Sequence, residues 1–202
     1  MPNQVSTAVF WDLFYGRTTN PDEWYLSFEH DAMKVLTPHV RGLNHGAVVM
    51  HLGCGASAIA NALATAMQCQ FLLVNMDFSA IVLRQLKEKE AGTIVPVDFL
   101  QMDARYLPYR NATIDLIVDK GTLDSILSDS TKQDTNSRLI TSELCRILRP
   151  GGKLLSVSTF RNEARERCLT YEGWSVECIV IPMTPYEYPD QKECYLYVMI
   201  KL

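Results

Sequence analysis

Short apolar runs alternate along the chain with segments in which apolar residues recur at helical spacing. This alternation is typical of a parallel sheet whose strands are joined by crossover helices. The predicted strands are Ala47–Leu52, Phe71–Met76, Ile94–Leu100, Thr113–Val118 and Lys153–Val157. The predicted helices are Ser57–Met67, a helix that Ser79 caps and that runs to Glu90, and Gln133–Leu148, which is followed by the turn residues Arg149-Pro150-Gly151-Gly152.

Both ends of the chain depart from this alternation. Trp174–Ile181 and Cys194–Ile200 are β-type segments with no helix between them, so we expect them to pair antiparallel. At the other end, Asn20–Pro38 carries apolar positions at helical spacing, with Asn20 as the N-cap and Pro21 at the first helical position. This segment predicts a helix ahead of the first strand.

The composition is that of an ordinary globular protein of one domain, with 202 residues, 48% of them hydrophobic and 21% charged. Residues 1–45 form the segment before the sheet, and residues 46–202 form the α/β core. The six cysteines include no CxxC pair and the four histidines have no metal-ligand spacing, so we expect no metal site. The sequence shows no apolar run of membrane-spanning length and no secretory signal. Its net charge of −4 argues against a nucleic acid partner.

Candidate site residues follow each of the first three strands. Gly53 and Gly55 form a glycine turn between a strand and a helix, where backbone N–H groups can hold an anionic group. Asp77 ends the second strand and can accept both hydroxyls of an adenosine ribose. Asp103-Ala104 follows the third strand, where the carboxylate can accept from an adenine amino group. Because parallel strands end at one edge of the sheet, these residues are expected to meet at the switch-point crevice.

The segment Asp119-Lys120-Gly121-Thr122-Leu123-Asp124 follows the fourth strand and would face the reacting group. Asp119 and Lys120 are the candidates for positioning an incoming nucleophile. Asp124 is equally explained as an acid in the first turn of a helix.

These features together resemble the seven-stranded, class I methyltransferases that use S-adenosylmethionine, over essentially the whole chain. The motifs LGCG, the acid after the second strand, MDA and LRPGG occur in that family's order. The resemblance implies a Rossmann-like, doubly wound α/β sheet of order 3-2-1-4-5-7-6 with strand 7 antiparallel, and S-adenosylmethionine as cofactor.

The DKGTLD segment resembles, more narrowly, the lysine methyltransferases that modify translation elongation factor 1A. The aromatic pattern of residues 10–15 and 23–25 has the same resemblance, which implies that Trp11, Tyr15 and Trp24 close the cofactor site. The sequence departs from the usual class I pattern at His51, which replaces an acid, and at Ser57, which replaces a third glycine. The candidate cofactor-binding residues are therefore Trp11, Tyr15, Trp24, Gly53, Gly55, Asp77, Phe78, Asp103, Ala104, Asp119 and Lys120.

The leading hypothesis is a protein-lysine N-methyltransferase that acts in the cytoplasm on a protein related to elongation factor 1A, with a mitochondrial location as the alternative. A lysine methyltransferase of the citrate synthase type, a small-molecule methyltransferase and a non-catalytic cofactor-binding scaffold remain the alternatives. The sequence leaves the acceptor, the degree of methylation and the oligomeric state open.

Overall fold

A computed structural model describes residues 7–18, 24–25, 32–128, 133–182 and 193–202 of the chain. Its centre is a seven-stranded sheet of order β3-β2-β1-β4-β5-β7-β6, which confirms the predicted order. The strands are β1 (Ala47–Leu52), β2 (Phe71–Asp77), β3 (Val97–Gln101), β4 (Ile114–Lys120), β5 (Leu148–Ser158), β6 (Trp174–Pro182) and β7 (Glu193–Lys201).

Strands β1 to β5 are parallel, whereas β7 runs antiparallel to both β5 and β6, as the missing crossover helix predicts. The central strands β1 and β4 are apolar along most of their length because helices cover both of their faces. Strand β3 lies at the sheet edge, and Pro96, which has no N–H to donate, precedes it.

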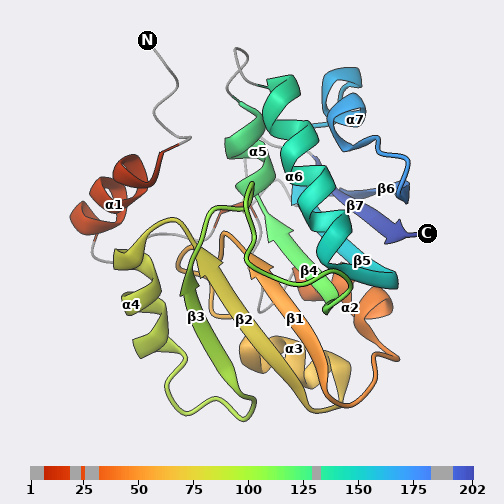
Figure 1. Ribbon diagram of the computed structural model, residues 1–202. Coiled ribbons are helices and arrows are strands. Elements are labelled where there is room, and N and C mark those ends of the chain that lie inside the picture. Colours follow the sequence, from red (N-terminus) through yellow and green to blue (C-terminus); the bar gives the residue numbers. More distant parts are fainter. Residues whose placement is uncertain (1–6, 19–23, 26–31, 129–132, 183–192) are drawn as a thin grey trace.

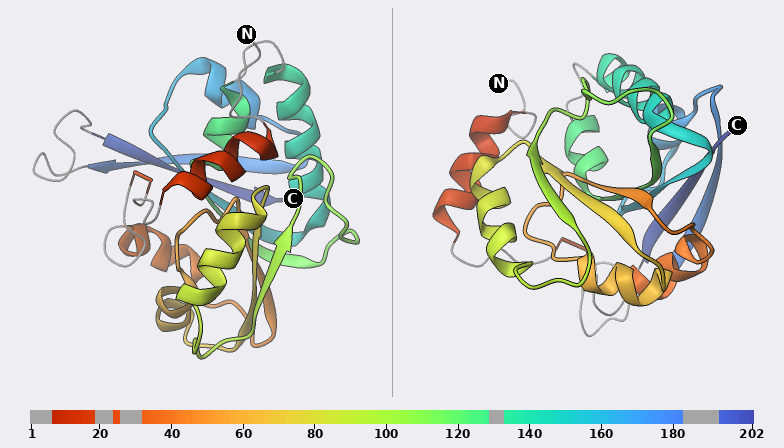
Figure 2. Two further views of the ribbon diagram at one scale, coloured as in Figure 1. Left: turned by 90° about the vertical axis from the view of Figure 1, so that its left-hand side faces the viewer. Right: turned by 60° about the horizontal axis from the view of Figure 1, so that its bottom comes forward.

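Helices cover the two faces of the sheet (Figures 1 and 2). Helices α2 and α3 pack on one face, and α5, α6 and α7 pack on the other. Helix α4 packs beside β2 and β3, and α1 lies against α4. The helices are α1 (Ala8–Arg17), α2 (Met33–Val40), α3 (Ala60–Met67), α4 (Ala80–Lys89), α5 (Thr122–Leu127), α6 (Gln133–Ile147) and α7 (Glu163–Leu169). No helix among the described residues is long and apolar enough to cross a membrane.

The segment Arg149–Gly152 differs from the prediction, because it belongs to β5 and is not a turn that precedes the strand. Ile114 of β4 pairs with Leu148, but Leu116 pairs with Lys153, so the additional residues of β5 form a bulge. Gly151 has φ +75° within this bulge, a conformation that glycine adopts without strain.

The helix predicted over Asn20–Pro38 is also corrected. The described helix starts at Met33 and continues through Pro38 to Val40, while Asn20 and Pro21 lie outside the described residues. Trp24 and Tyr25 form a bend, with Tyr25 at φ +63°. Tertiary contacts explain the bend, because the Lys120 Nζ donates to the Trp24 carbonyl at 2.6 Å.

Helix α1 is anchored to the core through the N-cap residue of α4. Ser79 caps α4 by accepting a hydrogen bond from Val82 N, and its hydroxyl donates to Asp12 Oδ1 at 2.6 Å. Gln85 of α4 donates to the Tyr15 carbonyl at 3.3 Å. Because of these contacts, α1 lies across the carboxyl end of β2.

Replacing Ser79 with Ala is expected to lower the free energy of unfolding by about 1–2 kcal/mol, because α4 loses its cap and Asp12 loses its donor. Asp12→Ala removes only the contact with α1 and leaves the cap, so the free energy of unfolding should fall less in this variant. Urea unfolding followed by circular dichroism measures both. Equal losses in the two variants would contradict the capping role of Ser79.

Candidate functional site

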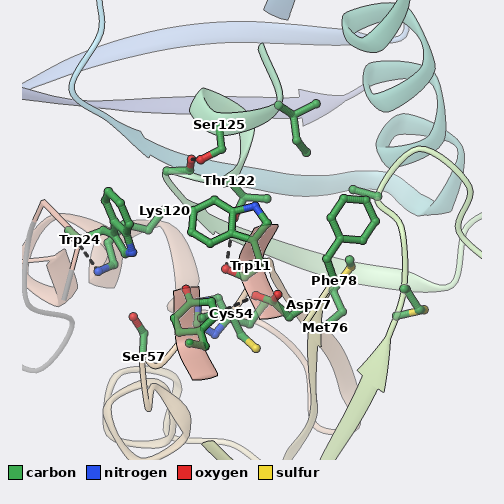
Figure 3. A pocket seen from close by; sticks show the side chains of 18 residues that line it. Trp11, Trp24, Cys54, Ser57, Met76, Asp77, Phe78, Lys120, Thr122 and Ser125 are labelled. Atoms are coloured by element: carbon green, nitrogen blue, oxygen red, sulfur yellow. Dashed lines mark hydrogen bonds between the residues drawn. The ribbon is translucent and has the colours of Figure 1, made fainter. Parts of the chain in front are cut away.

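A cavity of about 710 Å³, open in part to solvent, lies where β1, β2 and β4 end (Figure 3). This is the switch point of the sheet, where the strand order reverses and where open α/β sheets bind their ligands. Its lining residues come from α1, the bend at Trp24, the end of β1, the glycine turn, the ends of β2 and β4, the loop after β3, and α5. They are Trp11, Tyr15, Trp24, His51, Gly53, Cys54, Gly55, Ser57, Met76, Asp77, Phe78, Met102, Ala104, Lys120, Gly121, Thr122, Ser125 and Ile126.

The glycine turn between β1 and α3 requires glycine at two positions. Gly53 has φ +56°, and a Cβ there would lie 2.1 Å from Thr122 Oγ1. Gly55 has φ +52°, and a Cβ there would lie 2.9 Å from the Tyr15 hydroxyl. The positive φ angles and the close packing of Thr122 and Tyr15 therefore both exclude a side chain at these two positions.

Asp77 connects the glycine turn to the start of α4. Its Oδ2 accepts a hydrogen bond from Gly55 N and its Oδ1 accepts one from Ser79 N, each at 2.9 Å. Burial raises the pKa of this carboxyl, and the two backbone donors oppose that rise because they stabilise the charged form. The carboxylate is thus fixed at the cavity edge, and its contact with a ribose remains a prediction.

Three aromatic side chains, Trp11, Tyr15 and Trp24, line the side of the cavity that faces α1, and we refer to them as the aromatic roof. Trp11 stacks on Tyr15 with ring centroids 5.8 Å apart, and it meets Trp24 edge to face at 6.1 Å. Figure 3 shows Trp24 beside Lys120, whose Nζ donates to the Trp24 carbonyl. The aromatic roof is therefore bound to α4 through the Tyr15 carbonyl and to the end of β4 through the Trp24 carbonyl.

The Asp103 carboxylate is not among the groups that line the cavity. It forms an ion pair with Arg105 at 2.8 Å, and it also accepts a hydrogen bond from Arg105 N. The Arg105 guanidinium lies 5.7 Å from the ring centroid of Phe78, which does line the cavity. Asp103 thus holds the loop that presents Ala104, and its contact with an adenine remains a prediction.

The Asp119 carboxylate also points away from the cavity. It is fully buried, Oδ1 accepts from Thr122 N and Leu123 N at the start of α5, and Oδ2 accepts from the Ser156 hydroxyl at 2.5 Å. Burial raises its pKa to about 6, and the hydrogen bond from Ser156 opposes that rise. In this position Asp119 holds the segment that contains Lys120 and Gly121, and direct contact with a nucleophile remains a prediction.

Nine of the eleven candidate residues line the cavity. Asp103 and Asp119 do not line it, but they form hydrogen bonds within the segments that do. The candidate set missed further lining residues, although several have a signal in the sequence. Gly121 and Thr122 belong to the DKGTLD segment, and His51 at the end of β1 and Ser57 flank the glycine turn. Met102, Ser125 and Ile126 line the cavity through the packing of loops and α5, which no spacing indicates.

These residues fit the cofactor that the resemblance implies. The glycine turn lines the cavity with backbone and no side chain at Gly53 and Gly55, and a fixed carboxylate ends the second strand. Phe78, Met102 and Ala104 form an apolar side that suits an adenine ring, while Lys120 lies at the end of β4. S-adenosylmethionine would therefore lie with its adenosine towards Phe78 and its amino-acid end towards Lys120.

Comparisons with known proteins agree with this fold. Residues 43–197 match the protein family described as "Methyltransferase domain". The eEF1A lysine and N-terminal methyltransferase of Mus musculus is 28% identical over 180 residues, and that of Xenopus laevis is 31% identical over 179 residues. Each match covers 86% of this chain, which spans only 25% of the length of either relative.

The mitochondrial citrate synthase-lysine N-methyltransferase of Danio rerio is 23% identical over 181 residues, covering 80% of this chain and 70% of that protein. Among solved structures, a protein from Pyrococcus horikoshii OT3 has a TM-score of 0.67 at 16% identity and covers 96% of this chain and 99% of its own. A SAM-dependent methyltransferase from Methanosarcina mazei has a TM-score of 0.59 at 16% identity, with coverage of 79% and 94%. These two structures share the fold.

Gly53→Ala is expected to lower the affinity for S-adenosylmethionine at least about tenfold, because the new methyl group displaces Thr122 and strains the turn. Gly42→Ala is the matched control, since Gly42 also has a positive φ but nothing lies within 4 Å of its Cβ position. Isothermal calorimetry measures both affinities. Unchanged binding in Gly53→Ala would show that the turn does not approach the ligand.

Asp119 should make stability depend on pH. Its folded pKa of about 6 exceeds the unfolded value of about 3.9, so its contribution is full below about pH 4 and is lost as the pH rises through 6. Asp119→Asn has no carboxyl to ionise. Relative to the wild type, its free energy of unfolding should therefore rise by about 2 kcal/mol between pH 4 and pH 7. Urea unfolding at both pH values measures the difference, and a constant difference would refute the raised pKa.

Proposed function

Because this chain belongs to the methyltransferase-domain family, whose cofactor is S-adenosylmethionine, we propose that it methylates the ε-amino group of a lysine in a protein. The first choice of substrate is a protein related to elongation factor 1A, since relatives at 28% and 31% identity carry that substrate in their names. A citrate synthase-like protein is the second choice, on the name of a relative at 23% identity.

The observation that carries the proposal is the position of Trp24. Its side chain lines the cavity beside Lys120 and is nevertheless 44% exposed, so it spans the distance from the methyl-donor end to solvent. A long, unbranched side chain from a protein surface can follow such an aromatic face. An indole face also attracts the methylated ammonium that the reaction forms.

The reaction needs a neutral amine aligned with the methyl group, because an ammonium has no lone pair. Free lysine has a pKa of about 10.4, and an apolar, aromatic environment lowers it by disfavouring the charged form. The Lys120 side chain at the end of β4 disfavours a second cation nearby. The protein's contribution is therefore to orient the two reactants and to remove water, while the cofactor supplies the activated methyl group.

Asp119 and Lys120 are proposed as positioning residues. Asp119 holds the first turn of α5 through two backbone N–H groups, and Lys120 holds the Trp24 carbonyl. Together these contacts set the width of the opening between α5 and the aromatic roof. We propose a cytoplasmic site of action, with the mitochondrion as the alternative because one relative is named as mitochondrial.

The proposal is tested by incubating the purified protein with methyl-labelled S-adenosylmethionine and either cytosolic or mitochondrial extract. A labelled protein band whose modified lysine is located by mass spectrometry supports it, and the fraction that contains the band decides between the two substrates. Label found only in small molecules would overturn the lysine assignment.

Trp24→Ala is expected to lower kcat/KM for the protein acceptor about tenfold or more, because the variant loses the aromatic face. Trp24→Phe, which keeps an aromatic ring, should retain most of the activity. The affinity for S-adenosylhomocysteine, measured by calorimetry, should fall less than kcat/KM in Trp24→Ala. Equal losses in both quantities would assign Trp24 to the cofactor alone.

A further inference from the structure

Helix α1 carries apolar side chains on both of its sides. On the inner side, Trp11 and Tyr15 line the cavity, and Asp12 accepts a hydrogen bond from Ser79. The sequence of the helix, AVFWDLFYGR, has one further charged residue, Arg17 in its last turn. A helix at a protein surface normally turns a polar side to solvent. The outer side of α1 does not follow this pattern.

Four apolar residues form this outer side. Val9 and Leu13 lie one turn apart and are 68% and 54% exposed, and Phe10 and Phe14 beside them are half-buried. Residues three and four positions apart are neighbours on a helix, so these four form one surface, which we call the apolar outer face. Helix α1 lies on the outside of the molecule, beyond α4 (Figures 1 and 2). A contiguous apolar patch of this kind marks an interaction site.

The apolar outer face is continuous with the opening of the cavity. The Phe10 ring stacks on Phe14 with centroids 6.5 Å apart, and the Phe14 ring lies 6.3 Å from Trp24. Trp24 lines the cavity and is 44% exposed. A row of rings therefore leads from the outside of α1 to the opening between α5 and the aromatic roof.

We propose that the apolar outer face is the docking surface for a folded protein acceptor, which presents apolar side chains beside its target lysine. The proposal rests on the function proposed above and deepens it, because it names how the acceptor is recognised. Val9, Phe10, Leu13 and Phe14 carry no charge, so the contact is stabilised by burial of apolar surface. A small-molecule acceptor would enter the opening without touching the outside of α1.

A second copy of this chain is the competing occupant of the apolar outer face. A two-fold pair uses the same surface on both copies. Because this surface continues into Trp24, such a pair would cover the opening of both copies and exclude the acceptor. A protein acceptor that docks on the same surface places its lysine in the opening, so the geometry favours the acceptor.

The first test replaces Leu13 with Gln, which keeps the helix propensity and removes the apolar side chain. The KM for the folded acceptor should rise about tenfold, with kcat changed less than about twofold, because docking is weakened and the reacting groups are untouched. The acceptor is purified elongation factor 1A, or citrate synthase if the extract experiment selects it. Val9→Gln should also raise KM. Ile94→Gln is the matched control, because Ile94 is 74% exposed but precedes β3, away from the carboxyl ends of the strands.

The affinity for S-adenosylhomocysteine, measured by calorimetry, should stay the same in all three variants. An unchanged KM in Leu13→Gln, or an equal loss of affinity for S-adenosylhomocysteine, would overturn the docking surface. A wild-type dimer that Leu13→Gln converts to a monomer in sedimentation equilibrium would assign the surface to a second copy instead. If the wild type methylates no protein, the proposed function fails as well, whereas methylation that Leu13→Gln leaves unchanged refutes the docking surface alone.

The second test uses only the wild-type protein and therefore does not depend on the folding of a variant. Hydroxyl radicals oxidise exposed side chains, and mass spectrometry measures the oxidation of each residue. Leu13 and Phe10 should lose most of their oxidation when the folded acceptor is added above its KM, and Ile94 should keep its own. Equal oxidation of Leu13 with and without the acceptor would contradict the proposal.

Discussion

The carboxylate of Asp77 holds three segments that are distant in the sequence in one place. One oxygen fixes Gly55 in the glycine turn, and the other fixes Ser79 at the start of α4. Through the Ser79 hydroxyl, the same point reaches Asp12 of α1 and hence the aromatic roof. Any ligand that contacts Asp77 therefore also affects the glycine turn and helix α1.

The site separates two electrostatic tasks. At Asp77, backbone N–H groups satisfy a buried carboxylate, which removes the need for a cationic side chain there. At the end of β4, Lys120 is bound to a backbone carbonyl, and among the described lining residues Asp77 is the one carboxylate. A methyltransferase gains from this arrangement, because a nearby anion would stabilise the unreactive, protonated form of an amine acceptor.

Much of this arrangement could be predicted from the sequence, because parallel strands end at one edge and place Gly53, Asp77 and Lys120 together. Contacts between distant residues escaped prediction. Trp24 belongs to a bend because its carbonyl accepts from a side chain 96 positions away. Asp119 turns inward because Ser156, 37 positions away, donates to it. Helical spacing and strand position carry no information on such pairs.

The aromatic roof has a consequence for how the protein folds. Its contacts with the core, together with the contact of the neighbouring Asp12, join residues 67, 70 and 96 positions apart in the sequence. Contacts of such long range carry a large loop-closure entropy and form only after the elements at both ends exist. Strands β1 and β4 are themselves joined across 67 positions, as in the pair Val49 and Leu116. The cavity is therefore complete only when the sheet and α1 are both in place, so ligand binding reports that the whole chain has folded.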